Sequence, residues 1–145
     1  MDVGPGMEEG ERVLVVEDDQ AARVGLEQLI GMWGYTVASA SDGDEALTQL
    51  DDVDVVVLDM VMPGQDGIAT LQEIKQRKPL VEVILLTGHG TLESAVKALE
   101  LGAFYYLMKP AEMRELLENV AGAFKRKAEH EGRIRQAAIK RILML

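Results

Sequence analysis

Short apolar segments alternate with segments of helical periodicity along almost the whole chain. The short runs, rich in β-branched, aromatic and other apolar residues, are typical of buried strands, whereas apolar residues that recur every three or four positions are typical of one helix face. The runs predict strands over residues 13–16, 35–38, 55–58, 81–86 and 103–108. The periodic segments predict helices over residues 21–33, 42–50, 68–74, 91–101 and from 110 onward.

This alternation predicts an α/β fold built on a parallel sheet. The connections between the predicted elements are short, so right-handed crossovers should place helices on both faces of the sheet. Residues 55–58 are four apolar residues in succession, as expected for a strand that is buried on both faces. We expect one domain over residues 11–124, preceded by a flexible tail over residues 1–10.

The last predicted helix is longer than a single domain needs. Its first part carries an apolar stripe that would pack on the sheet, formed by Met113, Leu116, Leu117, Val120 and Phe124. The composition then changes to Lys125-Arg126-Lys127, which we expect to be a solvated face. A thinner apolar line continues at Ile134, Ala138 and Ile142. Residues 125–145 are therefore predicted to form a helical extension or linker.

Charge is unevenly distributed along this chain of 145 residues. Residues 1–110 hold 20 acids and 7 bases, a net charge of −13, whereas residues 111–145 hold 5 acids and 8 bases, a net charge of +3. The acidic body argues against direct nucleic acid binding by the predicted domain. The absence of cysteine excludes disulfides and a cysteine nucleophile. No apolar run approaches the roughly 18 residues of a membrane span, so we expect a cytoplasmic protein without membrane contact.

Polar residues stand at the ends of four predicted strands. Glu17 and Asp18 follow the first strand, Asp59 the third, Thr87 the fourth and Lys109 the fifth. The carboxyl ends of neighbouring parallel strands lie at one edge of a sheet, where ligands collect. Carboxylates placed together there raise one another's pKa unless a cation neutralises them, and oxygen ligands suit Mg²⁺ shared with a phosphate. The set predicts an aspartate that attacks a phosphoryl group, with Mg²⁺, the lysine and the threonine holding the phosphoryl oxygens.

Four sequence motifs at these strand ends carry a family resemblance. They are VVEDD at residues 15–19, LDMVMPG at 58–64, LTG at 86–88 and KP at 109–110. Together they resemble the receiver domain of two-component response regulators, over roughly residues 11–125. The resemblance implies a flavodoxin-like, doubly wound, five-stranded sheet of order 2-1-3-4-5. It also implies a signalling domain rather than an enzyme, in which Asp59 accepts a phosphoryl group from a histidine of a sensor histidine kinase.

The resemblance assigns the metal ligands and the lysine. Asp18, Asp59 and the backbone carbonyl of Val61 would bind Mg²⁺ directly, and Glu17 would act mainly through a metal-bound water. Many receivers have Asp at the position of Glu17, although Glu is also found, so we expect function to survive this difference. Lys109 would pair with Asp59 and then with the phosphoryl oxygens.

The resemblance also assigns a conformational switch. Thr87 would hydrogen-bond the phosphoryl group, and Tyr106 matches the aromatic switch position, whose ring turns inward when Thr87 moves. A half-buried strand aromatic without that role is the alternative for Tyr106, with Tyr105 as a competitor on the opposite face. His89, two residues after Thr87, could influence dephosphorylation by water, although a solvated loop histidine is the more common case.

Two other classes of protein fit the site less well. A phosphohydrolase with an aspartyl nucleophile usually has a second Asp two residues after the first, and here that position is Val61. A flavodoxin-type or nucleotide-binding module needs a glycine-rich phosphate loop after the first strand, where this chain has acids. A receiver-like fold that binds partners without phosphorylation is also conceivable, but the acids, Thr87 and Lys109 are all present.

The process that the phosphorylated domain would control is suggested by two segments around the fourth predicted helix. Residues 87–91 and 95–98 resemble receivers attached to ATPase-containing transcriptional activators. The resemblance implies transcription regulation, homodimerisation on phosphorylation through the fourth helix, fifth strand and fifth helix, and an output domain beyond residue 145. A stand-alone receiver that acts by protein–protein binding is the alternative.

Overall fold

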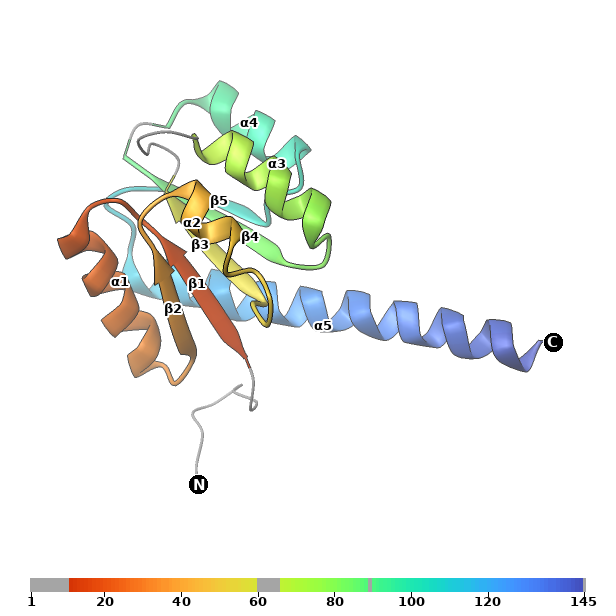
Figure 1. Cartoon of the computed structure of the whole chain (residues 1–145). Helices are drawn as coiled ribbons and strands as arrows, with labels where there is room; N and C mark the ends of the chain where they lie inside the picture. The colour runs from red at the N-terminus through yellow and green to blue at the C-terminus, as the bar shows by residue number, and fades with distance from the viewer. Residues whose placement is uncertain (1–10, 60–65, 89, 145) are drawn as a thin grey trace.

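The fold is a five-stranded parallel sheet with helices on both faces. The computed structural model describes residues 11–59, 66–88 and 90–144. Its strands run in the order β2-β1-β3-β4-β5, as predicted, and every neighbouring pair is parallel (Figure 1). The elements are β1 (Arg12–Val16), α1 (Gln20–Met32), β2 (Thr36–Ala40), α2 (Gly43–Leu47), β3 (Val55–Asp59), α3 (Gly67–Arg77), β4 (Glu82–Thr87), α4 (Leu92–Glu100), β5 (Tyr105–Met108) and α5 (Met113–Leu143).

The central strands bury both of their faces, which explains why their apolar runs are uninterrupted. Leu14, Val56 and Leu85 belong to a core that includes residues of α2, α3 and α4. Their neighbours along the strands, among them Val57 and Ile84, belong to a second core with residues of α1 and α5. Because successive strand residues point to opposite faces, both sets must be apolar.

Aspartates that precede three of the helices act as N-caps. The side chains of Asp19, Asp42 and Asp66 accept hydrogen bonds from backbone N–H groups in the first turns of α1, α2 and α3. A carboxylate at this position satisfies an N–H group that has no partner within the helix. The role of Asp19 as a cap leaves Glu17 and Asp18 for the edge of the sheet.

Helix α2 is shorter than the predicted span of residues 42–50. It ends at Leu47, where the Thr48 hydroxyl donates a 2.7 Å hydrogen bond to the carbonyl oxygen of Glu45. The side chain of Gln49 then donates to the carbonyl oxygen of Ser39 in β2, at 3.0 Å. The first bond closes the end of the helix, and the second ties the following residue to the sheet instead of to another helical turn.

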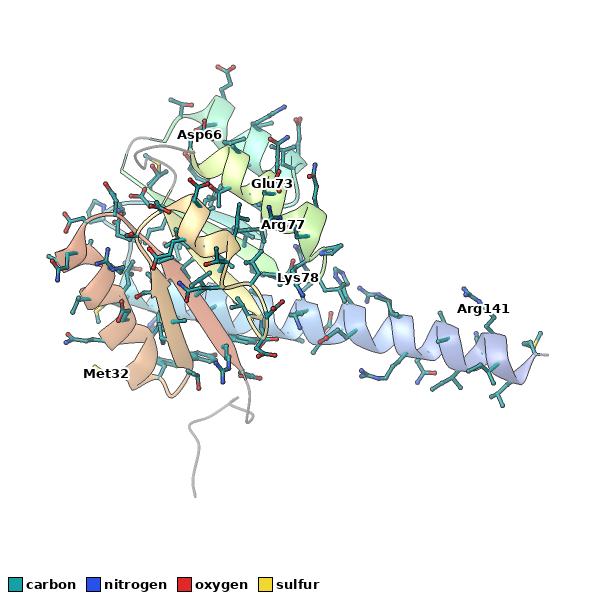
Figure 2. The ribbon with its side chains drawn as sticks, in the orientation of Figure 1. Met32, Asp66, Glu73, Arg77, Lys78 and Arg141 are labelled. Atoms are coloured by element: carbon teal, nitrogen blue, oxygen red, sulfur yellow. The ribbon has the colours of Figure 1, made fainter. Side chains whose placement is uncertain are left out.

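Helix α5 packs on the sheet at its start and extends beyond it (Figure 1). Phe124 stacks on Tyr35 with ring centroids 4.9 Å apart, whereas every described residue from Arg133 to Met144 is exposed. Figure 2 shows Arg141 on this extended part, away from the sheet. Within the described residues, no helix combines the length and apolarity that a membrane crossing requires.

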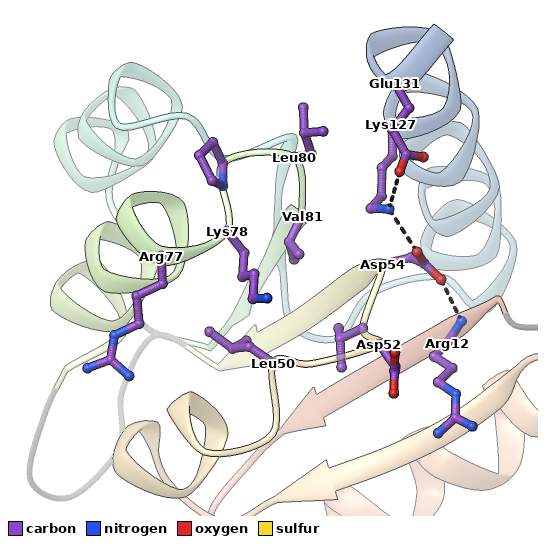
Figure 3. A pocket seen from close by; sticks show the side chains of 12 residues that line it. Arg12, Leu50, Asp52, Asp54, Arg77, Lys78, Leu80, Val81, Lys127 and Glu131 are labelled. Carbon is purple, nitrogen blue, oxygen red and sulfur yellow. Dashed lines mark hydrogen bonds and ion pairs between the residues drawn. The ribbon is translucent and has the colours of Figure 1, made fainter. Parts of the chain in front are cut away.

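The basic stretch at the point where α5 leaves the domain is not a solvated face, so that prediction is wrong for two of its three residues. Arg126 pairs with the buried Glu82 at the start of β4. Lys127 pairs with Asp54 at 2.9 Å and with Glu131 at 3.2 Å (Figure 3). The pairs with Glu82 and Asp54 attach α5 to the amino ends of the strands, two and three residues beyond the predicted domain limit at residue 124.

Candidate functional site

Three carboxylates meet at the carboxyl ends of β1 and β3. Oxygen atoms of Glu17, Asp18 and Asp59 all lie within 4.8 Å of one another. Glu17 is 2% exposed and Asp59 is 9% exposed, whereas Asp18 is open to solvent. The parallel register explains the meeting, because Val16 pairs with Leu58 and the acids follow directly on both strands.

Lys109 brings a positive charge to these carboxylates from the end of β5. Its Nζ donates a 2.6 Å hydrogen bond to Glu17 Oε1 and lies 3.6 Å from Asp59 Oδ2. Burial alone would lower the pKa of Lys109, but the hydrogen bond to Glu17 and the charge of Asp59 outweigh this effect and raise it. Lys109 is therefore a fixed cation, and in this state it lies closer to Glu17 than to Asp59.

The carboxylate of Glu17 has room for a further cation. Burial, and then the neighbouring Asp59, raise the pKa of Glu17, and Lys109 only partly offsets them. Its second oxygen, Oε2, is buried and accepts no hydrogen bond from the described residues. A buried carboxylate oxygen without a donor is costly, and a divalent cation that binds oxygen ligands would remove that cost. The three carboxylates therefore fit a Mg²⁺ ion.

Thr87 lies at the end of β4, fully buried, beside the backbone of Lys109. The backbone N–H of Lys109 donates a 2.8 Å hydrogen bond to the carbonyl oxygen of Thr87. The ends of β4 and β5 are thereby held together, which places a hydroxyl-bearing residue and the lysine on adjacent strands. Two residues of the predicted site, Val61 and His89, lie outside the residues that the structure describes.

Tyr106 lies on β5 with its ring half-buried against the core under α3 and α4. Its hydroxyl is 2.9 Å from Ser94 Oγ in the first turn of α4. The neighbouring Tyr105 is 41% exposed. Of the two tyrosines, Tyr106 is thus the one whose hydroxyl lies beside Gly90 and the first turn of α4, which follow Thr87 in the chain.

Two contacts of the site were not predicted from the sequence. Arg23 in α1 donates a 2.9 Å hydrogen bond from Nη1 to the backbone carbonyl oxygen of Glu17, which fixes the chain where β1 ends. Ser94 binds the hydroxyl of Tyr106, as described above. An arginine four residues after the cap Asp19 was a weak local signal for the first contact, and no local signal pairs residues 94 and 106.

A separate groove of about 720 Å³ lies at the opposite end of the sheet (Figure 3). Its walls come from the start of β1, the segment before β3, the segment before β4 and α5. Within it, Asp54 accepts hydrogen bonds from the Arg12 backbone and from Lys127. Asp54 and Glu131 are thus paired with Lys127, and the groove lies away from the strand ends that carry Glu17, Asp59 and Lys109, so it is not the candidate site.

Comparison with known proteins is consistent with this geometry. Residues 13–121 match the family model described as the response regulator receiver domain. The chain is 41% identical over 113 residues to the transcriptional regulatory protein ZraR of Salmonella typhimurium strain LT2, covering 77% of this chain and 26% of ZraR. It is 40% identical over 121 residues to the DNA-binding transcriptional regulator NtrC of Escherichia coli strain K12, covering 82% of this chain and 26% of NtrC. The chain thus spans about a quarter of the length of these relatives.

Solved structures show the same fold. A response regulator receiver domain protein from Clostridium thermocellum matches with a TM-score of 0.77 and 36% identity, covering 81% of this chain and 97% of that one. The CheX–CheY–BeF3–Mg²⁺ complex from Borrelia burgdorferi contains a chain that matches with a TM-score of 0.75 and 28% identity, covering 79% of this chain and 89% of that one.

Proposed function

The chain belongs to the response regulator receiver domain family, and we propose that its Asp59 accepts a phosphoryl group from a phosphohistidine of a sensor histidine kinase. The observation that supports this role is the position of Asp59, which shares one edge of the sheet with two other carboxylates and with Lys109. A carboxylate nucleophile needs neighbours that counter the charge of the incoming phosphoryl group.

In the proposed transfer, a carboxylate oxygen of Asp59 forms a bond to phosphorus. The bond between phosphorus and the imidazole nitrogen breaks, and that nitrogen keeps the electron pair. Lys109 Nζ, 3.6 Å from Asp59 Oδ2, turns from Glu17 to a phosphoryl oxygen, and the Thr87 hydroxyl donates to another. Each contact neutralises charge where the phosphoryl group arrives.

We further propose that Glu17, Asp18 and Asp59, with the backbone carbonyl of Val61, hold Mg²⁺. The bound ion would supply positive charge to the phosphoryl oxygens. Glu17 Oε2, which is buried and accepts no hydrogen bond within the described part of the chain, supports this assignment, as does the presence of Mg²⁺ and BeF3 in the related CheY complex. Glu17 would hold the ion mainly through a water, and His89 would influence dephosphorylation.

The proposed consequence of phosphorylation is a change on the surface formed by α4, β5 and α5. Thr87 moves toward the phosphoryl group, and Tyr106 changes position with it. The 40–41% identical ZraR and NtrC proteins are transcriptional regulators, and the matched residues make up 26% of each of them. By analogy, residues 11–124 would be the receiver, residues 125–145 a helical linker, and dimerisation of the phosphorylated form would regulate an attached transcriptional output domain.

Phosphorylation by a small phosphodonor such as acetyl phosphate tests the proposed function. The wild-type protein and an Asp44→Asn variant, which changes an exposed carboxylate on α2, should both gain one labile phosphoryl group. Asp59→Asn should gain none while keeping its circular dichroism spectrum. Labelling of Asp59→Asn at the wild-type rate would overturn the proposal.

A further inference from the structure

The hydroxyl of Tyr106 connects the sheet to the N-terminal cap of a helix. Thr91 is the N-cap of α4, and Ser94 completes a capping box with it: the Thr91 side chain accepts from the Ser94 N–H, and the Ser94 side chain accepts from the Thr91 N–H. Tyr106 Oη lies 2.9 Å from the same Ser94 Oγ. One oxygen atom thus serves both the helix cap and the tyrosine.

Ser94 Oγ has more polar neighbours than it can bond at once. It lies 2.9 Å from Thr91 N, 2.9 Å from Thr91 O and 3.1 Å from Thr91 Oγ1, in addition to Tyr106 Oη. A serine hydroxyl donates one hydrogen and accepts two. The backbone N–H and carbonyl of Thr91 use one acceptor site and the donor, so the hydroxyls of Tyr106 and Thr91 compete for the remaining acceptor site.

Gly90 provides the space for the tyrosine hydroxyl. A Cβ atom built on Gly90 would overlap Tyr106 Oη and would lie 2.5 Å from Met108 Sδ. Both contacts are far inside van der Waals distance, so a side chain at residue 90 would displace the hydroxyl or the methionine. Gly90 and Ser94 therefore enclose the hydroxyl from two sides, one by leaving space and the other by accepting a hydrogen bond.

We infer that Ser94 is a positioning residue that couples the ring of Tyr106 to the cap of α4. While the ring lies beside Gly90, Tyr106 donates to Ser94; when the ring withdraws, the Thr91 hydroxyl donates to the vacated site. The two backbone bonds of the capping box stay in place in both positions, whereas the Thr91 hydroxyl, at 3.1 Å, only partly replaces the 2.9 Å bond of Tyr106, so Ser94 favours the ring beside Gly90. The inference rests on the proposed role of Tyr106 as the switch, and it names the residue through which the ring reaches α4.

The ring position can be measured in unphosphorylated protein labelled with 3-fluorotyrosine. The ¹⁹F signal of Tyr106 is assigned by its loss in Tyr106→Phe, and Tyr105→Phe is the matched control. Ser94→Ala should lower the ratio of ring beside Gly90 to ring withdrawn by about 2- to 12-fold, the value of one net hydrogen bond. Gly90→Ala, which keeps Ser94 but fills the space, should shift the ring in the same direction. An unchanged ratio in Ser94→Ala overturns the inference.

The coupling to the helix is read from the backbone ¹H–¹⁵N signal of Thr91, whose N–H donates to Ser94 Oγ. Tyr106→Phe should shift this signal in the wild-type background and should not shift it in the Ser94→Ala background. The control Tyr105→Phe should not shift it in either background. An equal effect of Tyr106→Phe in both backgrounds means that the ring does not act through Ser94.

Titration with Mg²⁺ and beryllofluoride, a phosphoryl mimic, separates this inference from the proposed function. In the wild type, the Tyr106 ¹⁹F signal and the Thr91 amide signal should change with one midpoint. In Ser94→Ala the Tyr106 fluorine signal should still respond to beryllofluoride, whereas the shift of the Thr91 amide signal should be smaller than in the wild type. A Thr91 shift as large as in the wild type overturns the inference. A wild-type protein that shows the ring–cap coupling but no response to beryllofluoride contradicts the proposed function instead.

Discussion

Replacing Glu82 with Gln should destabilise the domain far more than the same replacement at Glu73. Glu82 is 1% exposed at the start of β4, and its carboxylate accepts from Lys75 of α3 at 3.4 Å and from Arg126 of α5 at 3.0 Å. Glu73 pairs with Arg77 at 3.2 Å within α3 (Figure 2), and their side chains are 41% and 53% exposed. The chemical change is identical, and only the burial of the pair differs.

The magnitude follows from the surroundings of the two cations. Removal of one partner from a buried ion pair costs about 3–5 kcal/mol, because the other charge remains buried. The Lys75 and Arg126 side chains keep 19% and 38% exposure, and Lys75 also donates to the carbonyl oxygens of Pro79 and Val81. Gln keeps one acceptor as well, so we expect a loss of about 2 kcal/mol, against about 0–0.5 kcal/mol for the exposed Glu73 pair.

Urea unfolding at neutral pH, followed by circular dichroism, measures the loss in free energy of unfolding for both variants. A thermal melt followed by the same signal gives a second measure. The melting temperature of Glu82→Gln should fall by about 4–8 °C, since each kcal/mol corresponds to about 2–4 °C in a chain of this size. A loss within about 0.5 kcal/mol of that for Glu73→Gln would refute the conclusion that Glu82 anchors α5 to the sheet.

Three further predictions concern the site and its output. Chelation of Mg²⁺ should abolish phosphorylation by acetyl phosphate, because Glu17, Asp18 and Asp59 then repel the incoming group; equal rates with and without chelator would contradict the metal assignment. Lys109→Gln removes a charge-assisted hydrogen bond worth about 1.5–3 kcal/mol, so the phosphorylation rate measured by intact mass should fall about 10- to 150-fold, and an unchanged rate would show that Lys109 does not contact the phosphoryl group. Phosphorylation should alter self-association through α4, β5 and α5, and identical sedimentation of both forms at high concentration would count against it.

The sheet and its strand-end residues could be predicted because their signals are local. The strands that carry the site are mostly apolar runs, and the parallel arrangement alone brings the residues that follow the strands to one edge. Glu17, Asp18 and Asp59 therefore meet as the pattern indicated, with Lys109 beside them. The closer approach of Lys109 to Glu17 than to Asp59 depends on side-chain length and packing, which the pattern does not contain.

Contacts between distant helix faces and strand ends could not be predicted in the same way. Arg126 meets Glu82 across 44 residues of sequence, and the basic stretch looked solvated because nothing nearby in the chain is its partner. The hydrogen bond between Ser94 and Tyr106 depends on how α4 lies against β5. A carboxylate at the start of the apolar run of β4 was the one available signal, since a buried charge requires a partner.

Identification of the residue that carries the phosphoryl group tests the central claim most directly. Borohydride reduces an aspartyl phosphate to homoserine, so peptide mass spectrometry of the phosphorylated and reduced wild-type protein locates the modified residue. The account predicts homoserine at position 59, only after phosphorylation in the presence of Mg²⁺. Homoserine at another aspartate, or a phosphoryl group on a side chain that borohydride does not reduce, would contradict it.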